Sequence, residues 1–167
     1  ALRSVVIYLL IYAAMNLGAF AVVLAVSRKT RSGEISSFGG LFQYAPGLTV
    51  CMTIFLFSLA GIPPAGGWFA KLGIFRALAS AGTTSGYVLA VIVGINSVIA
   101  FGYYGRLMRV MWMDEVPDGD RTPVRVPSAL TFALIITVGV TMLFGVLPGV
   151  LTHFTDSVTL VSLPMLR

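Results

Sequence analysis

The sequence predicts an all-α, polytopic helical membrane protein with four spans, of which the second is a discontinuous helix, and an interfacial helix at the C-terminus. Hydrophobic residues make up 57% of the 167-residue chain, and the mean hydropathy of +0.96 is typical of helical membrane proteins. Charged residues make up only 10% and are clustered, leaving uncharged windows at 4–27, 35–70, 77–105 and 126–155. Each window is at least as long as the roughly 20 residues that cross a hydrocarbon core.

The four spans are expected at 4–26, 45–81, 87–113 and 128–147, within a single membrane domain that covers residues 1–167. The tail at 149–167 is too polar to cross a bilayer. Its apolar residues nevertheless recur at helical spacing, which predicts a helix lying in the membrane interface. The chain does not begin with Met, so we expect it to be part of a larger protein.

Basic residues are distributed unevenly between the connections. The connection at 27–44, and the one at 114–127 with the helix end before it, carry seven basic residues, whereas the turn GTTSG at 82–86 carries no charge. Because basic loops stay inside, we expect these two loops to be cytoplasmic and the turn and the C-terminus to lie outside the cell. This bias accounts for the net charge of +5, and nucleic-acid binding is not needed to explain it.

The second span is interrupted in its middle by helix-breaking residues, namely Gly61, Pro63, Pro64, Gly66 and Gly67. Proline lacks an N–H and its ring clashes with the preceding turn, so two prolines between glycines should open the helix. The freed carbonyls are tolerated in hydrocarbon only where protein or water satisfies them, and broken helices of this kind form ion sites in transporters. A structural proline kink is the alternative interpretation.

A single lysine follows the break. Lys71 lies seven residues past Pro64, which is about 10 Å of helix rise and keeps its amine within the depth of the membrane. A charge there is costly unless it meets water, a carbonyl or a carboxylate, so Lys71 is a functional candidate. Desolvation favours the neutral amine, which makes the group titratable. Alternatively, Lys71 snorkels to the interface, as we expect Arg76 to do.

Polar residues in the spans form a possible polar path through the membrane, comprising Tyr8, Tyr12, Asn16, Thr53, Ser58 and Asn96. The first three are spaced by four residues and therefore share one face of a helix. Such groups could line a water path, or they could form hydrogen bonds between helices.

Other kinds of chemistry are not indicated by the sequence. No His, Cys or Glu cluster has metal-ligand spacing, no Gly-rich loop precedes a phosphate-binding lysine, and no Ser or Cys has a nearby candidate base. We therefore expect neither a metal nor a cofactor in this chain, and no active site for covalent chemistry.

Three segments carry a resemblance to a known family: YLLIYAAMNLGAFAVV at 8–23, EISSFGGL at 34–41 and SLAGIPPAGGWFAK at 58–71. They resemble the C-terminal part of subunit N of bacterial respiratory complex I, the type 1 NADH:quinone oxidoreductase, within the wider family of antiporter-like proton-pumping subunits. Full-length members have fourteen transmembrane helices, so the resemblance implies that the four spans are the last four, with the discontinuous twelfth helix as the second.

The resemblance also implies a function. The chain would be part of a translocase that moves protons across the bacterial inner membrane, coupled to quinone reduction elsewhere in the complex. Lys71 would be the proton relay, and water held at the break would convey the proton. The expected partners are the other membrane subunits and the lipid bilayer. NADH, FMN, the iron–sulfur clusters and quinone would be bound by partner subunits, so that this chain performs no redox chemistry itself.

Two alternatives stay open. A subunit of a multisubunit Na⁺/H⁺ antiporter would share the broken helix and the lysine, and a structural assembly subunit would have no ion path. The sequence departs from the family pattern in having GGW at 66–68, and the family's earlier glutamate and lysines have no counterpart in this chain.

Overall fold

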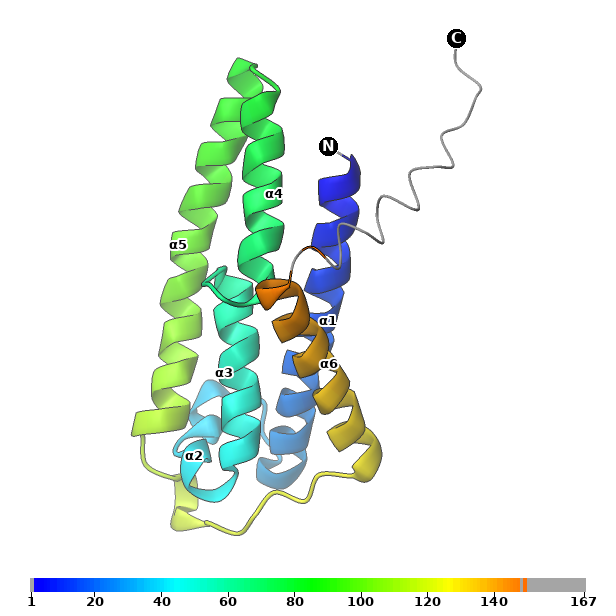
Figure 1. Cartoon of the computed structure of the whole chain (residues 1–167). Helices are drawn as coiled ribbons and strands as arrows, with labels where there is room; N and C mark the ends of the chain where they lie inside the picture. Colours follow the sequence, from blue (N-terminus) through cyan, green and yellow to red (C-terminus); the bar gives the residue numbers. More distant parts are fainter. Residues whose placement is uncertain (1, 148, 150–167) are drawn as a thin grey trace.

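The computed structural model describes residues 2–147 and 149, with side chains from residue 5 onwards, and Figure 1 shows the arrangement of the helices. All secondary structure in this part of the chain is helical. The elements are α1 (Leu2–Thr30), η1 (Ile35–Phe38), α2 (Leu41–Tyr44), α3 (Pro46–Ala60), α4 (Gly66–Ser80), α5 (Thr84–Met113), η2 (Pro117–Gly119) and α6 (Ser128–Val146). The predicted all-α fold is confirmed. Apart from Gly149, the predicted interfacial helix at 149–167 lies outside the described residues.

Among the described residues, three segments are long and apolar enough to cross a membrane, namely Val5–Thr30, Thr84–Gly119 and Ser128–Val146. Helix α3 is a shorter apolar helix of 15 residues. Figure 1 shows α4 following α3 along nearly the same direction, with a short irregular segment between them. The chain is therefore a polytopic helical membrane protein, and α3 and α4 together form the discontinuous helix that the prolines and glycines predict.

The connection at 114–127 has the predicted bounds, whereas the other two are shorter than the sequence suggested. Helix α5 begins at Thr84 because the Thr83 hydroxyl accepts a hydrogen bond from the Gly86 amide, 3.1 Å away, and so caps the helix. The last three residues of the predicted turn at 82–86 are therefore helical. Similarly, α1 continues to Thr30, and the predicted loop at 27–44 contains the short helices η1 and α2.

Helix α1 is packed against α3, α4 and α6. Its fully buried side chains include Ile11, Met15 and Val22. The ring of Phe55 from α3 is also fully buried, and it occupies the space into which a side chain at Gly18 would project. The glycine in α1 thus permits the close contact between α1 and α3 on which the core is built.

The two basic connections meet at one end of the bundle, opposite the α4–α5 turn (Figure 1). The Lys29 amine at the end of α1 forms an ion pair with the Asp120 carboxylate at 3.6 Å and donates hydrogen bonds to the carbonyls of Asp120 and Thr122. It also lies 4.0 Å from the centroid of the Tyr44 ring. A hydrogen bond from the Thr122 amide, and secondarily the charge of Lys29, hold the pKa of Asp120 below its usual value.

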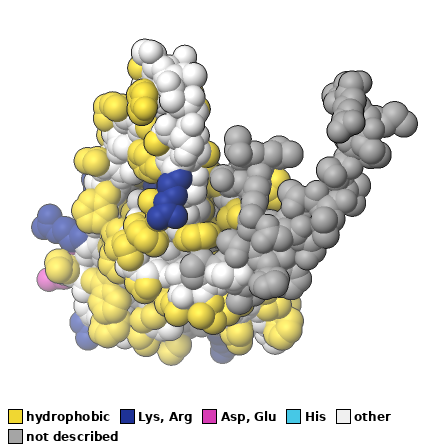
Figure 2. All heavy atoms as spheres, turned by 45° about the horizontal axis from the view of Figure 1, so that its top comes forward, with side chains coloured by type: hydrophobic (Ala, Val, Ile, Leu, Met, Phe, Trp, Pro, Cys, Tyr) yellow, Lys and Arg dark blue, Asp and Glu magenta, His cyan; other side chains and the backbone are white. Residues whose placement is uncertain are grey.

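Much of the remaining surface is apolar. The exposed fraction is 74% for Val98, 68% for Leu17 and 67% for Phe20. Figure 2 shows hydrophobic side chains spread over one face of the molecule, where Lys and Arg side chains are few. Such a surface requires lipid or other apolar membrane segments around it.

The contact between Gly18 and Phe55 gives a direct test of the packing. We expect Gly18→Val to destabilise the protein by about 1–3 kcal/mol, because the new methyl groups would displace the buried ring. Gly102→Val is the matched control, since no atom lies within 4 Å of a Cβ placed there. Thermal unfolding in detergent should show a lower midpoint for Gly18→Val alone, and equal midpoints for the two variants would contradict the packing.

Candidate functional site

The break between α3 and α4 begins with a glycine in a left-handed conformation. Gly61 has φ of +86° and follows the last residue of α3. Its amide donates to the carbonyls of Phe57 and Ser58, each at 3.0 Å, and the Ile62 amide donates to Phe57 at 2.9 Å. This is the Schellman arrangement, which ends a helix while satisfying two of its last four carbonyls.

The other two carbonyls are bound by Lys71. Its amine donates to the carbonyl oxygens of Leu59 and Ala60, each at 3.0 Å. The side chain reaches them from the second turn of α4, and its stem passes so close to Gly61 that a Cβ there would lie 2.8 Å from Lys71 Cδ. An ammonium group at the C-terminal end of α3 is also favoured by the dipole of that helix. Lys71 therefore completes the cap of the helix that precedes its own.

Lys71 has no acidic partner in the part of the chain that the structure describes. The ion pair found there joins Lys29 to Asp120 at the end of the bundle. The Lys71 side chain is half-buried, and the two contacts of its amine are neutral carbonyls. Its charge is thus stabilised by dipoles and is not neutralised by a carboxylate of these residues.

The start of α4 is capped by a side chain of α3. The Ser58 hydroxyl oxygen accepts a hydrogen bond from the Gly67 amide at 2.9 Å, and the hydroxyl lies 3.2 Å from Met15 Sδ of α1. Ser58 is completely buried. A Cβ at Gly67 would overlap the carbonyl oxygen of Ser58, so glycine is required for this close approach. Ser58 consequently joins both halves of the broken helix to α1.

Helix α6 covers one side of the break. The carbonyl of Pro64, which follows a cis peptide bond with Pro63, occupies the position where a Cβ of Gly145 would lie. A Cβ at Gly66 would lie 2.9 Å from the carbonyl of Thr141. The small residues of the break therefore allow its backbone to pack directly against the backbone of α6.

Of the predicted polar path, the structure places only Ser58 at the break with Lys71. The Asn16 amide donates to the Tyr12 carbonyl at 3.0 Å, and the rings of Tyr8 and Tyr12 stack with centroids 5.6 Å apart. Thr53 accepts a hydrogen bond from Trp112 Nε1 at 2.9 Å. Asn96 lies on an exposed face of α5. A continuous path through these residues stays a prediction.

Sequence reasoning did not place three further residues at the break. Met15, Thr141 and Gly145 lie on α1 and α6, far from the break along the chain, and only the packing of the helices brings them there. The Gly145-x-x-x-Gly149 spacing is typical of close helix contacts, but it matches the motif only formally because Pro148 lies inside it. Among the described residues, no group of three or more His, Cys, Asp or Glu residues could hold a metal ion.

The role of Ser58 can be tested with a conservative substitution. Ser58→Ala should leave the buried Gly67 amide without a partner, which costs about 1–3 kcal/mol and should speed hydrogen exchange at the start of α4. Ser97→Ala is the control, because the Ser97 hydroxyl bonds only to Val93 in its own helix, at 2.8 Å. Hydrogen exchange followed by mass spectrometry measures both effects, and unchanged exchange around residue 67 would rule out the cap.

Comparison with known proteins identifies the family. The family model described as NADH:quinone oxidoreductase/Mrp antiporter, TM, matches residues 1–100. NADH-quinone oxidoreductase subunit N of Geobacillus sp. is 40% identical over 92% of this chain and 30% of its own length.

Two further relatives agree with this result. Subunit N of Rhodospirillum rubrum is 38% identical over 89% of the chain and 30% of its own length. The chloroplastic NAD(P)H-quinone oxidoreductase subunit 2 of Mesostigma viride is 46% identical over 69% of the chain and 22% of its own length. The chain thus spans less than a third of the length of these relatives. It belongs to the NADH:quinone oxidoreductase/Mrp antiporter family of membrane proteins.

Proposed function

We propose that this chain is part of a proton-translocating membrane subunit of an NADH:quinone oxidoreductase, and that Lys71 carries the proton. The observation that carries the proposal is the position of the Lys71 amine, which bridges the two halves of a broken membrane helix through the carbonyls of Leu59 and Ala60. The names of the relatives support membership in an oxidoreductase complex.

The surroundings of Lys71 suit a group that gains and loses a proton. Its partial burial opposes the charged form, whereas the dipole of α3 and two carbonyl acceptors favour that form. No carboxylate of the described residues holds the charge of Lys71. A change in a neighbouring charge can therefore shift the protonation equilibrium of its amine in either direction. When Lys71 is deprotonated, its hydrogen bonds to the carbonyls at the end of α3 would lose the positive charge that strengthens them, which would couple protonation to the geometry of the break.

In the proposed cycle, Lys71 accepts a proton from polar groups within the membrane and releases it toward the outside. Water at the break would convey the proton. The remaining steps belong to other parts of the complex, where NADH, FMN, iron–sulfur clusters and quinone are bound. The exposed apolar side chains of α1 and α5, such as Leu17 and Val98, would be covered by other membrane segments and by lipid.

A Na⁺/H⁺ antiporter subunit is the second candidate function, because the description of the family model includes the Mrp antiporters. The names of the three relatives above favour the oxidoreductase. Purification of the protein from native membranes distinguishes the two functions, since subunits that oxidise NADH should copurify only with the first.

Substitution of Lys71 tests the proposed relay. Within the assembled complex, Lys71→Met keeps an apolar stem but removes the titrating group, so proton pumping should fall at least about tenfold. Lys71→Arg should also impair pumping, because the guanidinium stays protonated and cannot release its proton. Membrane vesicles that report both NADH-dependent quinone reduction and the proton gradient provide the measurement.

The control for these variants is Arg76→Met, which removes an exposed cation on the same helix. It should leave pumping nearly unchanged, because we expect Arg76 to anchor the helix at the interface. If assembled Lys71→Met complex pumps at the unmodified rate, Lys71 serves only to cap α3.

The proposed orientation places the connections at 27–44 and 114–127 in the cytoplasm of a bacterial cell, and the turn at 82–86 and the C-terminus outside. In a protein with Cys51→Ala, cysteines introduced at the exposed positions Ser36 and Gly119 should be shielded from an impermeant thiol reagent in intact cells. A cysteine at the exposed Thr84 should be labelled. Labelling of the first two positions with protection of the third would reverse the orientation.

A further inference from the structure

We propose that the end of the bundle that carries the basic connections holds an anionic phospholipid, with one acyl chain between α3 and α6 and the phosphate between Arg28 and Arg125. This inference goes beyond proton translocation and does not depend on it. It rests on two adjoining cavities of opposite character, one apolar and one cationic.

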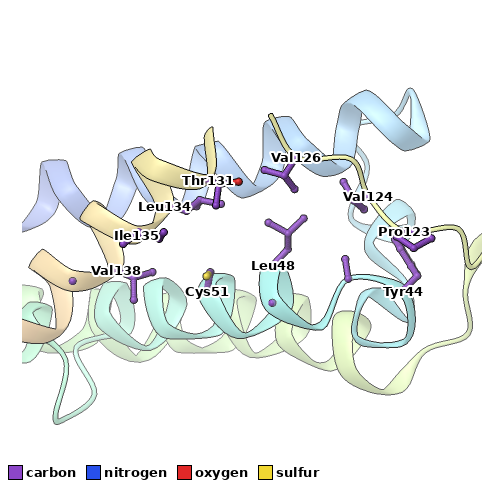
Figure 3. A pocket seen from close by; sticks show the side chains of 13 residues that line it. Tyr44, Leu48, Cys51, Pro123, Val124, Val126, Thr131, Leu134, Ile135 and Val138 are labelled. Carbon is purple, nitrogen blue, oxygen red and sulfur yellow. The ribbon is translucent and has the colours of Figure 1, made fainter. Parts of the chain in front are cut away.

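The apolar cavity has a volume of about 570 Å³, within the range of roughly 300–1,000 Å³ that is usual for small-molecule sites. Figure 3 shows Leu48 and Cys51 of α3 on one side, Leu134 and Val138 of α6 on the other, and Val124 of the connection at one end. Along α6 the lining extends from residue 131 to residue 139, which is about 12 Å of helix rise.

The walls of this cavity offer little to a polar ligand. Thr131 carries a hydroxyl there, and it already donates a hydrogen bond to the Pro127 carbonyl at 3.3 Å. The other α6 residues in the lining are Leu134, Ile135, Val138 and Gly139. An elongated apolar group such as an acyl chain therefore suits the cavity better than a polar or charged group.

The second cavity, of about 760 Å³, adjoins the first, because Pro123 and Val124 line both. Its charged lining consists of Arg28, Lys29, Arg125 and Asp120. Three cations and one carboxylate leave two positive charges in excess. Lys29 is already bound to Asp120 and to the backbone of the connection, so the excess lies on the two arginines.

Arg28 and Arg125 are both exposed, and within the described residues neither forms an ion pair. Arginine is well suited to phosphate because its planar guanidinium can donate two parallel hydrogen bonds. Arg28 also lies in the last turn of α1, at the end of the bundle that carries the basic connections. An occupant with an apolar chain and an anionic headgroup matches both cavities at once, and an anionic phospholipid has this chemistry.

The test uses the full-length subunit that contains this chain, in its assembled complex, reconstituted with phosphatidylglycerol that carries a photoreactive diazirine in one acyl chain. After irradiation, mass spectrometry should find crosslinks in the peptides around Cys51 and Leu134–Val138. Crosslinking at these peptides should fall about fivefold for each arginine removed in Arg28→Gln and Arg125→Gln. It should be similarly weak with phosphatidylcholine that carries the same photoreactive chain.

Two matched controls accompany the test. Arg121→Gln removes an exposed cation of the same connection that lines neither cavity, so crosslinking should be unchanged. Cys51→Phe should fill the apolar cavity and suppress the crosslinks, whereas Cys51→Ala should keep them.

Equal crosslinking with both lipids, unaffected by the arginine variants, would show ordinary surrounding lipid and overturn the site. Absence of crosslinks in all proteins would show that another segment of the longer protein fills the cavity, which also overturns it.

Discussion

The need to satisfy backbone carbonyls at the end of α3 constrains the whole structure. A helix that stops within the membrane leaves four carbonyls without intrahelical partners, and hydrocarbon offers no water to bind them. Two are bound by the amides of Gly61 and Ile62, and the other two by the Lys71 amine. The Lys71 amine thus completes the end of α3 and ties α4 to it.

The same solution links structure to the proposed function. A carboxylate beside Lys71 would hold its charge firmly, whereas two carbonyl dipoles stabilise the charge and can be exchanged for water. The cap of α3 thus depends on the protonation of one amine. Ser58 joins α3, α4 and α1 through Gly67 and Met15, and in the proposed cycle it would keep the two halves together when that amine changes its charge. The hydrogen bond between Ser58 and Gly67 thus lies near the hydrogen bonds of Lys71, whose amine can titrate.

The two ends of the bundle differ in charge. At the end with the basic connections, Lys29 holds the connection at 120–122 against α1. That contact uses one cation and leaves Arg28 and Arg125 available to an anion. The α4–α5 turn at the opposite end carries no charge. The membrane-embedded break, with its lysine, lies between these ends.

The sequence by itself determined the class of protein, the helical fold and the broken second span, and it singled out Lys71 as the candidate functional residue. These follow from hydropathy and from local backbone chemistry, because proline and glycine act on their own segment of chain. Only the tertiary structure decided which groups bind the free backbone carbonyls and amides at the break. Met15 and Gly145 lie far from it in sequence, and their contacts depend on how α1 and α6 pack. The lysine partners are main-chain carbonyls, which every residue possesses, so no sequence pattern could specify them.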